Sequence, residues 1–363
     1  MSKKICIVVH NFSDYGGVGV VASNLANEFA NSDSRDVFLL SLIKDGRPLA
    51  YELSEKVKYH GILTKETRLR TQLKELLKPV TKFLKNNQID VAIIMGHWPA
   101  FLISPVKPFV KTKFVFCDHG ALMNQWEDKK NTFMRLIAST VSNHTVVLTK
   151  RTREDYIKHF LISKKKIDYI YNWIEERPED SIKYDNKSKR IISAGRFGYE
   201  KGFDQLVEIM SPVIRKHDDW HLDIYGDGEM MNIVQQKIKE YKIEKNVHIM
   251  GEVRDVRKLF KKYAFYVLPS FREGLPIVLL EAKCNLLPIV SFDVMTGPAE
   301  IVRDGIDGML IEARNNEKFS DAVNYLIERE ATRTSMSNNA KGNLEEFKKH
   351  KIMKQWEKLI DNI

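Results

Sequence analysis

One pattern occurs twice in this chain, and it constrains the fold more than any other feature. A short apolar run leads into a glycine-containing loop, and the loop leads into a segment with helical spacing. The first copy comprises residues 5–9, 11–19 and 20–29, and the second comprises residues 190–194, 195–202 and a helix from Phe203. Each copy is the opening of a Rossmann-like unit of strand, loop and helix. The repeat therefore predicts an α/β protein with two such domains.

The length and the stretch between the two copies agree with that division. A chain of 363 residues favours two domains. Residues 175–189 are polar and charged and include Pro178, which is typical of a linker. We therefore expect an N-terminal domain over residues 1–172 and a C-terminal domain over residues 173–339.

Cysteine usage and hydropathy narrow the class of protein. The three cysteines, Cys6, Cys117 and Cys284, form no C-x-x-C pair, which argues against a disulfide scaffold or a structural zinc site. The first apolar run is too short for a signal peptide, and no later run approaches the ~20 apolar residues of a membrane-spanning helix. We expect a cytoplasmic protein that is soluble or peripheral on the inner face of the plasma membrane.

The charge is unevenly distributed along the chain. Residues 1–172 hold 27 Lys and Arg against 16 Asp and Glu, whereas residues 173–363 hold 31 against 32. A basic half suggests a polyanionic partner, which includes a phospholipid surface, a phosphorylated substrate or nucleic acid.

The segment 65–85 carries much of this positive charge on an amphipathic pattern. Its leucines follow helical spacing, and Pro79 is expected to kink or split the helix. One interpretation is a solvated surface helix that packs by its apolar stripe. The other is an anionic-membrane patch, in which each Lys or Arg contributes about 1 kcal/mol.

The stretch 269–282 predicts an anion site in the second half. It follows an apolar run at 264–268, and Pro276 suits the first position of a helix. The first turn of that helix offers backbone N–H groups and the positive end of the helix dipole. Glu273 precedes the helix, and Glu281 lies inside it after four apolar residues. A buried acid needs a partner, and a pair of sugar hydroxyls would be suitable.

Other polar residues follow predicted strands, where ligands sit in open α/β sheets. His97 follows the run 91–95, although a surface histidine in a loop explains it equally well. Asp118 and His119 follow the run 113–117. Asp118 has three open interpretations: it orients His119, binds an acceptor or belongs to a turn.

Two cations bracket the glycine loop of the second copy. Arg196 offers a bidentate fork to phosphate oxygens, and Lys201 adds a compact charge. A diphosphate leaving group requires such neutralisation. The alternative for both residues is a surface ion pair.

Taken together, these motifs resemble the retaining glycosyltransferases of family 4, which have the GT-B fold. The matching features are G-R-x-x-x-x-K-G at 195–202, E-x7-E with Gly-Leu-Pro between the acids, and Gly-Pro-x-Glu at 297–300. The resemblance implies two Rossmann-like domains facing across a cleft, with the acceptor on the first and the donor on the second. It also implies that a last helix, about 340–363, packs back on the first domain.

The resemblance implies transfer of a hexose or N-acetylhexosamine with retention from a nucleoside-diphosphate sugar, and UDP is the expected nucleotide. The expected acceptor is a growing, lipid-linked glycan in surface polysaccharide biosynthesis. Catalytic roles fall on His119, Glu273, Arg196 and Lys201. Acceptor binding falls on Asp118 and His119. Donor binding falls on Gly16, Gly17, Arg196, Lys201, Gly226, Val253, Glu273, Gly274, Leu275, Ile277, Val278 and Glu281.

Two further expectations come from what the sequence lacks. No D-x-D pair occurs, so we expect no metal clamp on the diphosphate and no required cofactor.

Family members usually have Gly where Leu286 stands, and such a Gly often ends a helix in a left-handed conformation. The neighbouring Asn285 can adopt that conformation instead.

Three other functions are alternatives to glycosyl transfer. A nucleotide-sugar epimerase or hydrolase on the same fold stays open. A nucleic-acid-binding module is disfavoured, because Phe83 is the only aromatic residue in the basic segment 65–85. An NAD oxidoreductase is disfavoured, because the loop at 16–19 reads G-G-x-G and not G-x-G-x-x-G.

Overall fold

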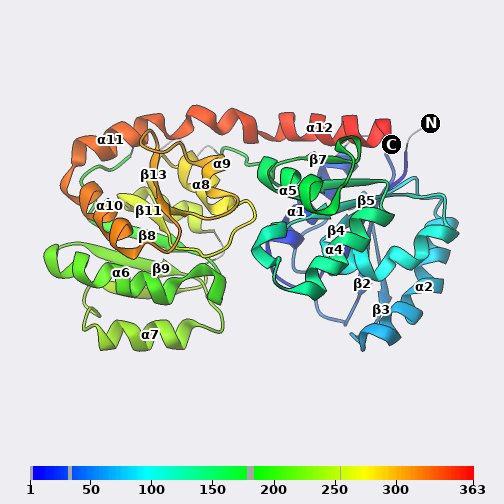
Figure 1. The fold of residues 1–363 in the computed structure, drawn as a ribbon, viewed down its shortest axis with the longest axis horizontal. Coiled ribbons are helices and arrows are strands. Elements are labelled where there is room, and N and C mark those ends of the chain that lie inside the picture. Colours follow the sequence, from blue (N-terminus) through cyan, green and yellow to red (C-terminus); the bar gives the residue numbers. More distant parts are fainter. Residues whose placement is uncertain (1–2, 32–34, 178–183, 254) are drawn as a thin grey trace. The chain divides into compact units, whose positions relative to one another are not determined.

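The chain forms two units, each built around a parallel β-sheet (Figure 1). The computed structural model describes residues 3–31, 35–177, 184–253 and 255–363. The first unit comprises the chain up to Ile170 together with Gln355–Ile363, and the second comprises Tyr171–Lys354. Residues 340–354 thus belong to the second unit, whereas the sequence analysis grouped them with the returning helix. Part of the expected linker, residues 178–183, lies outside the described residues.

The first sheet has seven strands in the order β3-β2-β1-β4-β5-β6-β7, and all neighbouring strands are parallel. Its central strands are continuous buried apolar runs, as expected of a sheet covered on both faces. The exposed residues of β3 mark it as an edge strand, and the sequence analysis missed it. The strands are β1 (Ile5–Asn11), β2 (Val37–Ile43), β3 (Val57–Leu63), β4 (Val91–Met95), β5 (Lys113–Asp118), β6 (His144–Val147) and β7 (Ile167–Tyr169).

Helices connect these strands in the order that a doubly wound sheet requires. The core lies between the sheet and the helices α2, α3 and α5. The helices are α1 (Gly17–Asn31), α2 (Leu69–Asn86), α3 (His97–Ile103), α4 (Lys129–Val141) and α5 (Lys150–Phe160), with the 3₁₀ segments η1 (Ser104–Phe109), η2 (Leu122–Gln125) and η3 (Lys164–Lys166).

Three local features of this unit bear on the predictions. Pro79 lies inside α2 and does not split it, and both Pro79 and Glu75, four residues before it, are exposed. Helix α1 begins at Gly17 and not at residue 20. His97 begins helix α3 and does not lie in a loop.

The second sheet has six parallel strands in the order β10-β9-β8-β11-β12-β13. Strand β8 has the bounds of the predicted run 190–194, and β11 begins one residue after the start of the predicted run 264–268. The strands are β8 (Arg190–Ala194), β9 (His221–Tyr225), β10 (Val247–Gly251), β11 (Phe265–Leu268), β12 (Ile289–Asp293) and β13 (Gly308–Glu312).

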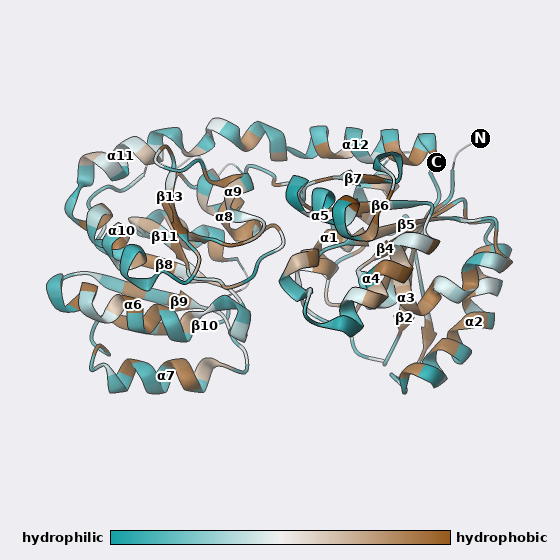
Figure 2. Cartoon of the chain, viewed as in Figure 1, coloured by the Kyte–Doolittle hydropathy of each residue, from teal (hydrophilic) through white to brown (hydrophobic). Residues whose placement is uncertain are grey.

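Two helical layers cover this sheet. Figure 1 shows α6 and α7 on one side and α8 and α9 on the other, and α10 packs against α6. Figure 2 shows the apolar colouring gathered on the strands and on the inner faces of the helices. The helical segments are η5 (Tyr199–Lys201), α6 (Phe203–Lys216), α7 (Met231–Glu240), η6 (Val256–Lys262), α8 (Ile277–Cys284), α9 (Pro298–Ile301), α10 (Asn316–Glu328), α11 (Glu330–Asn339), η7 (Ala340–Phe347) and α12 (Lys349–Asn362).

The C-terminal segment is not the single helix that was predicted over about 340–363. It forms α11, η7 and α12, separated at Lys348, which has an extended backbone. The amide of Ile174 donates to the carbonyl of Phe347 at 2.9 Å. The carbonyl of Phe347 therefore bonds to the segment that follows β7 and not to a later helical amide. This explains why the helix is interrupted at Lys348.

The end of α8 also differs from expectation. Leu286 itself adopts the left-handed conformation, with φ of 61°, whereas Asn285 has φ of −93°. The position where family members have glycine therefore keeps its backbone conformation in this chain, although leucine carries a steric cost there.

Candidate active site

Each sheet has one point where the strand order reverses, and ligands of open α/β sheets bind outside the carboxyl ends of the strands there. In the second sheet that point lies between β8 and β11, which pair in parallel through Phe265–Ile191 and Tyr266–Ile192. The loops that leave these two strands are 195–202 and 269–276. They contain five of the twelve residues that were predicted to bind the donor, and three more lie in helix α8 (Ile277–Cys284), which follows the second loop.

The two loops are joined through their backbones. The amide of Phe271 donates to the carbonyl of Glu200 at 2.8 Å. Gly202 has φ of 65°, and a Cβ placed there would lie 2.5 Å from the carbonyl oxygen of Pro269. Glycine is therefore required at 202 by both the turn and the close approach.

A charged pair joins the same loops through their side chains. Lys201 Nζ lies 2.7 Å from Glu273 Oε1, and both side chains are largely buried. The hydroxyl of Thr296 donates to the carbonyl of Glu273 at 2.7 Å. Two predicted site residues are thus brought together, and Lys201 is held by an acid of the site.

Helix α8 begins at Ile277, one residue after the predicted start, and Pro276 precedes it as the N-cap. The backbone before it packs against another loop, because a Cβ on Gly297 would lie 2.6 Å from the carbonyl oxygen of Gly274. Leu275 is buried. The first-turn N–H groups of α8, at Ile277 and Val278, come directly after the loop that carries Glu273 and have no acceptor within the helix.

Tyr266 is a member of this cluster that the sequence analysis missed. Its hydroxyl donates to the carbonyl of Ala194 at 2.8 Å and accepts from the amide of the same residue at 2.9 Å. Burial raises the pKa of Tyr266, and the nearby charges of Glu273 and Glu281 raise it further. A tyrosine within a buried strand needs a hydrogen-bond partner, and that requirement could have revealed it.

The loops after β9 and β10 lie at the same edge. A Cβ on Gly226 would lie 1.9 Å from the carbonyl oxygen of Gly195, and the amide of Gly226 donates to the carbonyl of Gly251. Val253 follows in the next loop and is exposed. Gly226 thus lies on a loop that contacts the β8 loop, and Val253 lies on the loop beyond it, after β10.

Arg196 is placed differently from Lys201. Its guanidinium lies 3.1 Å from a carboxylate oxygen of Glu229, and both side chains are exposed. This surface ion pair is the alternative that the sequence analysis weighed for Arg196.

In the first sheet the strand order reverses between β1 and β4. Gly16 and Gly17 follow β1, and a Cβ on either would meet nothing within 4 Å. The amide of Gly16 donates to the hydroxyl of Tyr51 at 2.6 Å. No close packing within the described protein requires glycine at these two positions.

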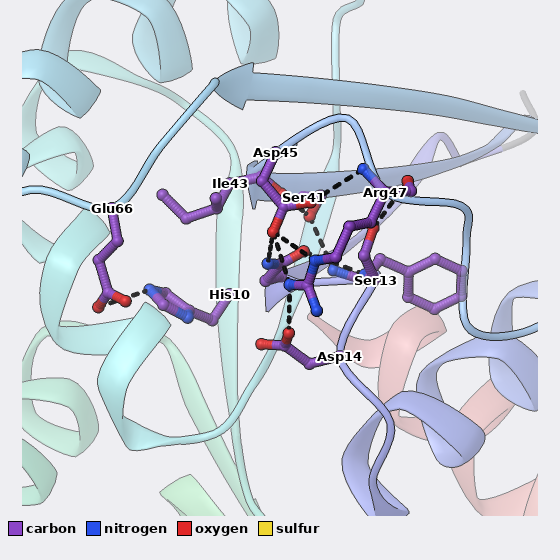
Figure 3. A network of polar contacts seen from close by, with 10 residues as sticks. His10, Ser13, Asp14, Ser41, Ile43, Asp45, Arg47 and Glu66 are labelled. Atoms are coloured by element: carbon purple, nitrogen blue, oxygen red, sulfur yellow. Dashed lines mark hydrogen bonds and ion pairs between the residues drawn. The ribbon is translucent and has the colours of Figure 1, made fainter.

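A network of polar side chains ties the loop after β1 to the loop after β2 (Figure 3). Arg47 lies 2.6 Å from Asp14 and hydrogen-bonds Asp45 through Nε at 2.9 Å, and Asn11 donates to the same carboxylate. Hydrogen bonds from Arg47 and Asn11 hold the pKa of Asp45 below its ordinary value. His10 lies beside this network, 3.8 Å from Glu66. The sequence analysis assigned no role to these residues.

His119 follows β5 at the same edge, and it is neutral near pH 7. Burial lowers its pKa to about 4 against an opposing effect of Asp118. Its Nε2 atom is buried and has no hydrogen-bond partner within the described chain. A neutral imidazole can both donate and accept a hydrogen bond, as contact with a sugar hydroxyl requires.

Asp118 is directed into the interior. Its carboxylate is 2.9 Å from the guanidinium of Arg135 and accepts a hydrogen bond from Tyr156 at 2.7 Å. Of the three interpretations that the sequence left open, this geometry favours orientation of the His119 loop.

His97 lies 3.2 Å from Asn131 and is half-buried, so it is not a free surface histidine. Within the described ranges, no group of three or more His, Cys, Asp or Glu side chains is arranged to hold a metal ion. In the same part of the chain, no helix combines the length and the apolar character that membrane crossing needs.

Comparison with known proteins agrees with this fold. Residues 175–343 match the glycosyl transferases group 1 family, and residues 15–177 match glycosyltransferase family 4. The amylovoran biosynthesis glycosyltransferase AmsD of Erwinia amylovora is 29% identical over 366 residues, covering 99% of each chain.

Two further relatives are informative. The N-acetylgalactosamine-N,N'-diacetylbacillosaminyl-diphospho-undecaprenol 4-alpha-N-acetylgalactosaminyltransferase of Campylobacter jejuni is 26% identical over 282 residues, covering 75% of this chain and 76% of its own. A crystal structure of a mutant of S. aureus TarM with Fondaparinux, alpha-GlcNAc-glycerol and UDP has a TM-score of 0.83 at 16% identity, covering 99% of each chain.

The two parallel sheets and the two family matches define an α/β transferase. The chain belongs to the glycosyltransferases of the GT-B fold, with family 4 sequence in its first half and group 1 sequence in its second. The predicted fold class and the predicted enzyme class are confirmed.

Proposed function

We propose that this glycosyltransferase moves a hexose or N-acetylhexosamine from a nucleoside-diphosphate sugar, with UDP as the nucleotide, to a lipid-linked glycan in surface polysaccharide biosynthesis. The observation that carries the proposal is the Lys201–Glu273 pair, which joins the β8 and β11 loops at the reversal of strand order. The pair places a cation and an acid immediately before the first turn of α8.

Each charged residue of this cluster has a role that its position supports. Lys201 and the first-turn N–H groups of α8 stabilise the negative charge that develops on the departing diphosphate. Glu273 accepts hydrogen bonds from sugar hydroxyls, and Glu281 accepts them from the ribose. Arg196 reaches the diphosphate by leaving Glu229, and this exchange costs little because exposed ion pairs are weak.

Retention of the anomeric configuration is part of the proposal. Glu273 is engaged by Lys201, so it is poorly placed to serve as a nucleophile in a double displacement of the glycosidase kind. The diphosphate charge would then be balanced by the protein while the acceptor attacks from the same face. Analysis of the linkage formed, by NMR of the product, tests retention directly.

The names of the relatives support the acceptor and the donor. AmsD is named for amylovoran biosynthesis, the Campylobacter jejuni enzyme for a diphospho-undecaprenol acceptor, and the TarM complex contains UDP. A lipid diphosphate acceptor would bring further negative charge to the basic first unit. His119 would contact the sugar or the acceptor.

We further propose that activity needs no metal ion or other cofactor. The sequence contains no D-x-D pair, and Lys201 and Arg196 would supply the positive charge that a metal ion supplies elsewhere. Activity should persist in EDTA. Loss of turnover in EDTA that Mn²⁺ restores would contradict this part of the proposal.

Association with an anionic membrane is proposed from helix α2. Its buried face includes Leu76, Val80 and Leu84, so the apolar stripe is used for packing. A row of cations occupies the exposed face, at Arg70, Lys74, Lys78, Lys82 and Lys85. Like charges at this spacing repel one another, and an anionic surface would relieve that repulsion. A variant with all five cations changed to Gln should sediment less with anionic vesicles than wild type does. Wild type should not sediment with neutral vesicles.

The donor is tested by ligand-dependent thermal stability and by product analysis. UDP should raise the melting temperature of the purified chain, whereas GDP and NAD should raise it little. A panel of UDP-sugars with lipid-diphosphate acceptors then identifies the reaction. Release of free sugar without an acceptor would indicate a hydrolase. Conversion of the donor into a different UDP-sugar would indicate an epimerase. A triple variant at Arg196, Lys201 and Glu281 that retained UDP affinity and transfer would overturn the assignment.

A further inference from the structure

A buried charged cluster stands at the carboxyl end of β5, next to His119. The Asp118 carboxylate is fully buried, and its Oδ2 atom accepts from Arg135 Nε at 2.9 Å and from the Tyr156 hydroxyl at 2.7 Å. Its Oδ1 atom accepts from the backbone amide of Gly120 at 3.1 Å. The cluster therefore joins β5, α4 and α5 to the loop that contains His119.

This cluster fixes the backbone on both sides of His119. Asp118 precedes the histidine, and its side chain holds the amide of Gly120, which follows it. A Cβ placed on Gly120 would lie 2.6 Å from the Arg135 guanidinium. The guanidinium thus packs directly against the loop backbone, and its position limits where the His119 ring can lie.

We propose that Arg135 is a positioning residue for His119, acting through the Asp118 carboxylate and by direct packing on Gly120, with Tyr156 as a second support. The inference rests on the proposed function, in which His119 contacts the sugar or the acceptor. Nothing in the sequence pattern marks Arg135 or Tyr156, since both occur in helices with ordinary amphipathic spacing.

Packing alone is a poor explanation for this cluster. A buried ion pair contributes little net stability compared with apolar residues of similar volume. The cluster also lies at the carboxyl edge of the sheet, where ligands bind. A planar cation that donates to the carboxylate through Nε and packs on the loop through its guanidinium orders both in one arrangement, which an apolar pair would not do.

The surroundings of Asp118 make the role measurable. Burial opposes ionisation of Asp118, but Arg135, His97, and hydrogen bonds from Tyr156 and the Gly120 amide outweigh burial and keep its pKa below the ordinary value. The other titratable neighbours of Asp118 are Cys117 and His119. Burial raises the pKa of Cys117 and lowers that of His119, and the negative charge of Asp118 acts to raise both pKa values.

Removal of Arg135 should therefore introduce a new pH dependence. Without the guanidinium, burial of Asp118 is no longer offset by its main cation, and the pKa of Asp118 should rise. A protonated Asp118 holds the Gly120 amide less well. Activity of the Arg135→Gln variant should accordingly increase with pH over a range in which wild-type activity is flat.

The experiment compares kcat and KM from pH 5.5 to 9 for wild type, Arg135→Gln, Arg135→Lys and Tyr156→Phe, with the folded fraction measured by circular dichroism. We expect Arg135→Gln to lose about 100-fold in kcat at pH 7, as misplacement of a catalytic group predicts, with little change in donor KM. Arg135→Lys should recover part of the loss. Tyr156→Phe should show a smaller change in the same direction.

A matched control separates positioning from stability. Arg333 is a buried arginine of the second unit that donates to the carbonyl of Ile327 at 2.9 Å. Arg333→Gln should lower the melting temperature without altering the pH profile of kcat. An Arg135→Gln variant that behaved like this control would overturn the proposal.

Two outcomes keep the test decisive. If Arg135→Gln does not fold, Tyr156→Phe takes its place, and a pH profile identical to wild type overturns the proposal. If wild type transfers no sugar, the proposed function is wrong, but the positioning role can still be tested by NMR titration of His119. Arg135→Gln should shift the His119 signals and pKa, and unchanged signals would overturn the positioning role.

Discussion

Two ion pairs stand at corresponding edges of the two sheets, and they differ in burial. Lys201 and Glu273 lie 2.7 Å apart with 22% and 7% of their side chains exposed, whereas Arg135 and Asp118 lie 2.9 Å apart with 1% and 0% exposed. The partly exposed pair can exchange its partners when a charged ligand arrives. The buried pair cannot, because either ion left alone would be costly to bury.

This contrast separates two uses of charge in one enzyme. In the second unit the ions belong to the proposed diphosphate site, and close backbone contacts at Gly202 and Gly226 provide the rigid frame. In the first unit the ions form the frame beside His119, the proposed contact of the sugar or the acceptor.

The largest expected effect is on stability. Asp118→Ala leaves the Arg135 guanidinium buried without its carboxylate, and we expect a loss of about 3–5 kcal/mol in the free energy of unfolding. Urea denaturation measures this loss. The Asp118→Leu, Arg135→Met double variant should recover most of it, and a double variant as unstable as the single one would remove the distinction between the two pairs.

The next effect is on catalysis. Lys201→Ala removes a cation from the proposed diphosphate site, and we expect kcat to fall by about 10²–10³-fold, comparable to loss of one oxyanion-hole donor. Lys237→Ala is the matched control, because Lys237 has a similar exposure and also contacts acids, Asp204 and Glu208. Equal losses in both variants would show that Lys201 acts through stability alone.

The third effect concerns pH. Burial lowers the pKa of His119 to about 4, whereas an unfolded histidine titrates near 6.5. The unfolded state therefore binds the proton first, and stability should fall as the pH is lowered from about 6.5 to 4. The contribution is at most about 3 kcal/mol. His119→Gln should show a flatter decline in urea denaturation across this window, and an identical decline would contradict the buried, neutral assignment.

The smallest effect comes from two glycines. Gly226→Ala would place a Cβ 1.9 Å from a carbonyl oxygen, at a φ of 135°, and should cost about 2 kcal/mol or more. Gly16→Ala meets nothing within 4 Å and should change the melting temperature very little. If Gly16→Ala nevertheless raises the KM for the donor, the first unit also approaches the diphosphate.

The regular parts of the fold could be predicted because they depend on local pattern. The apolar run at 190–194 indicated strand β8 with its correct ends, and the two glycine loops indicated the two domains. The edge strand β3 was missed, because its exposed lysine and histidine interrupt the apolar pattern.

The site was only partly predictable, for a physical reason. Residues with a motif, such as Lys201 and Glu273, could be named from sequence, and the structure brings them together. Arg135 and Tyr156 converge on Asp118 from helices 17 and 38 residues away, and such long-range convergence leaves no local signal. The pairing of Arg196 with Glu229 is equally non-local.

The division of the chain has a consequence for how the protein assembles as it is made. The last nine residues belong to the first unit, where Lys3 donates to the carbonyl of Ile360 and Arg35 pairs with Asp361. In sequence, the second unit is therefore an insertion within the first. The ribosome therefore makes the helical residues 355–363, which belong to the first unit, only after it has made the whole second unit.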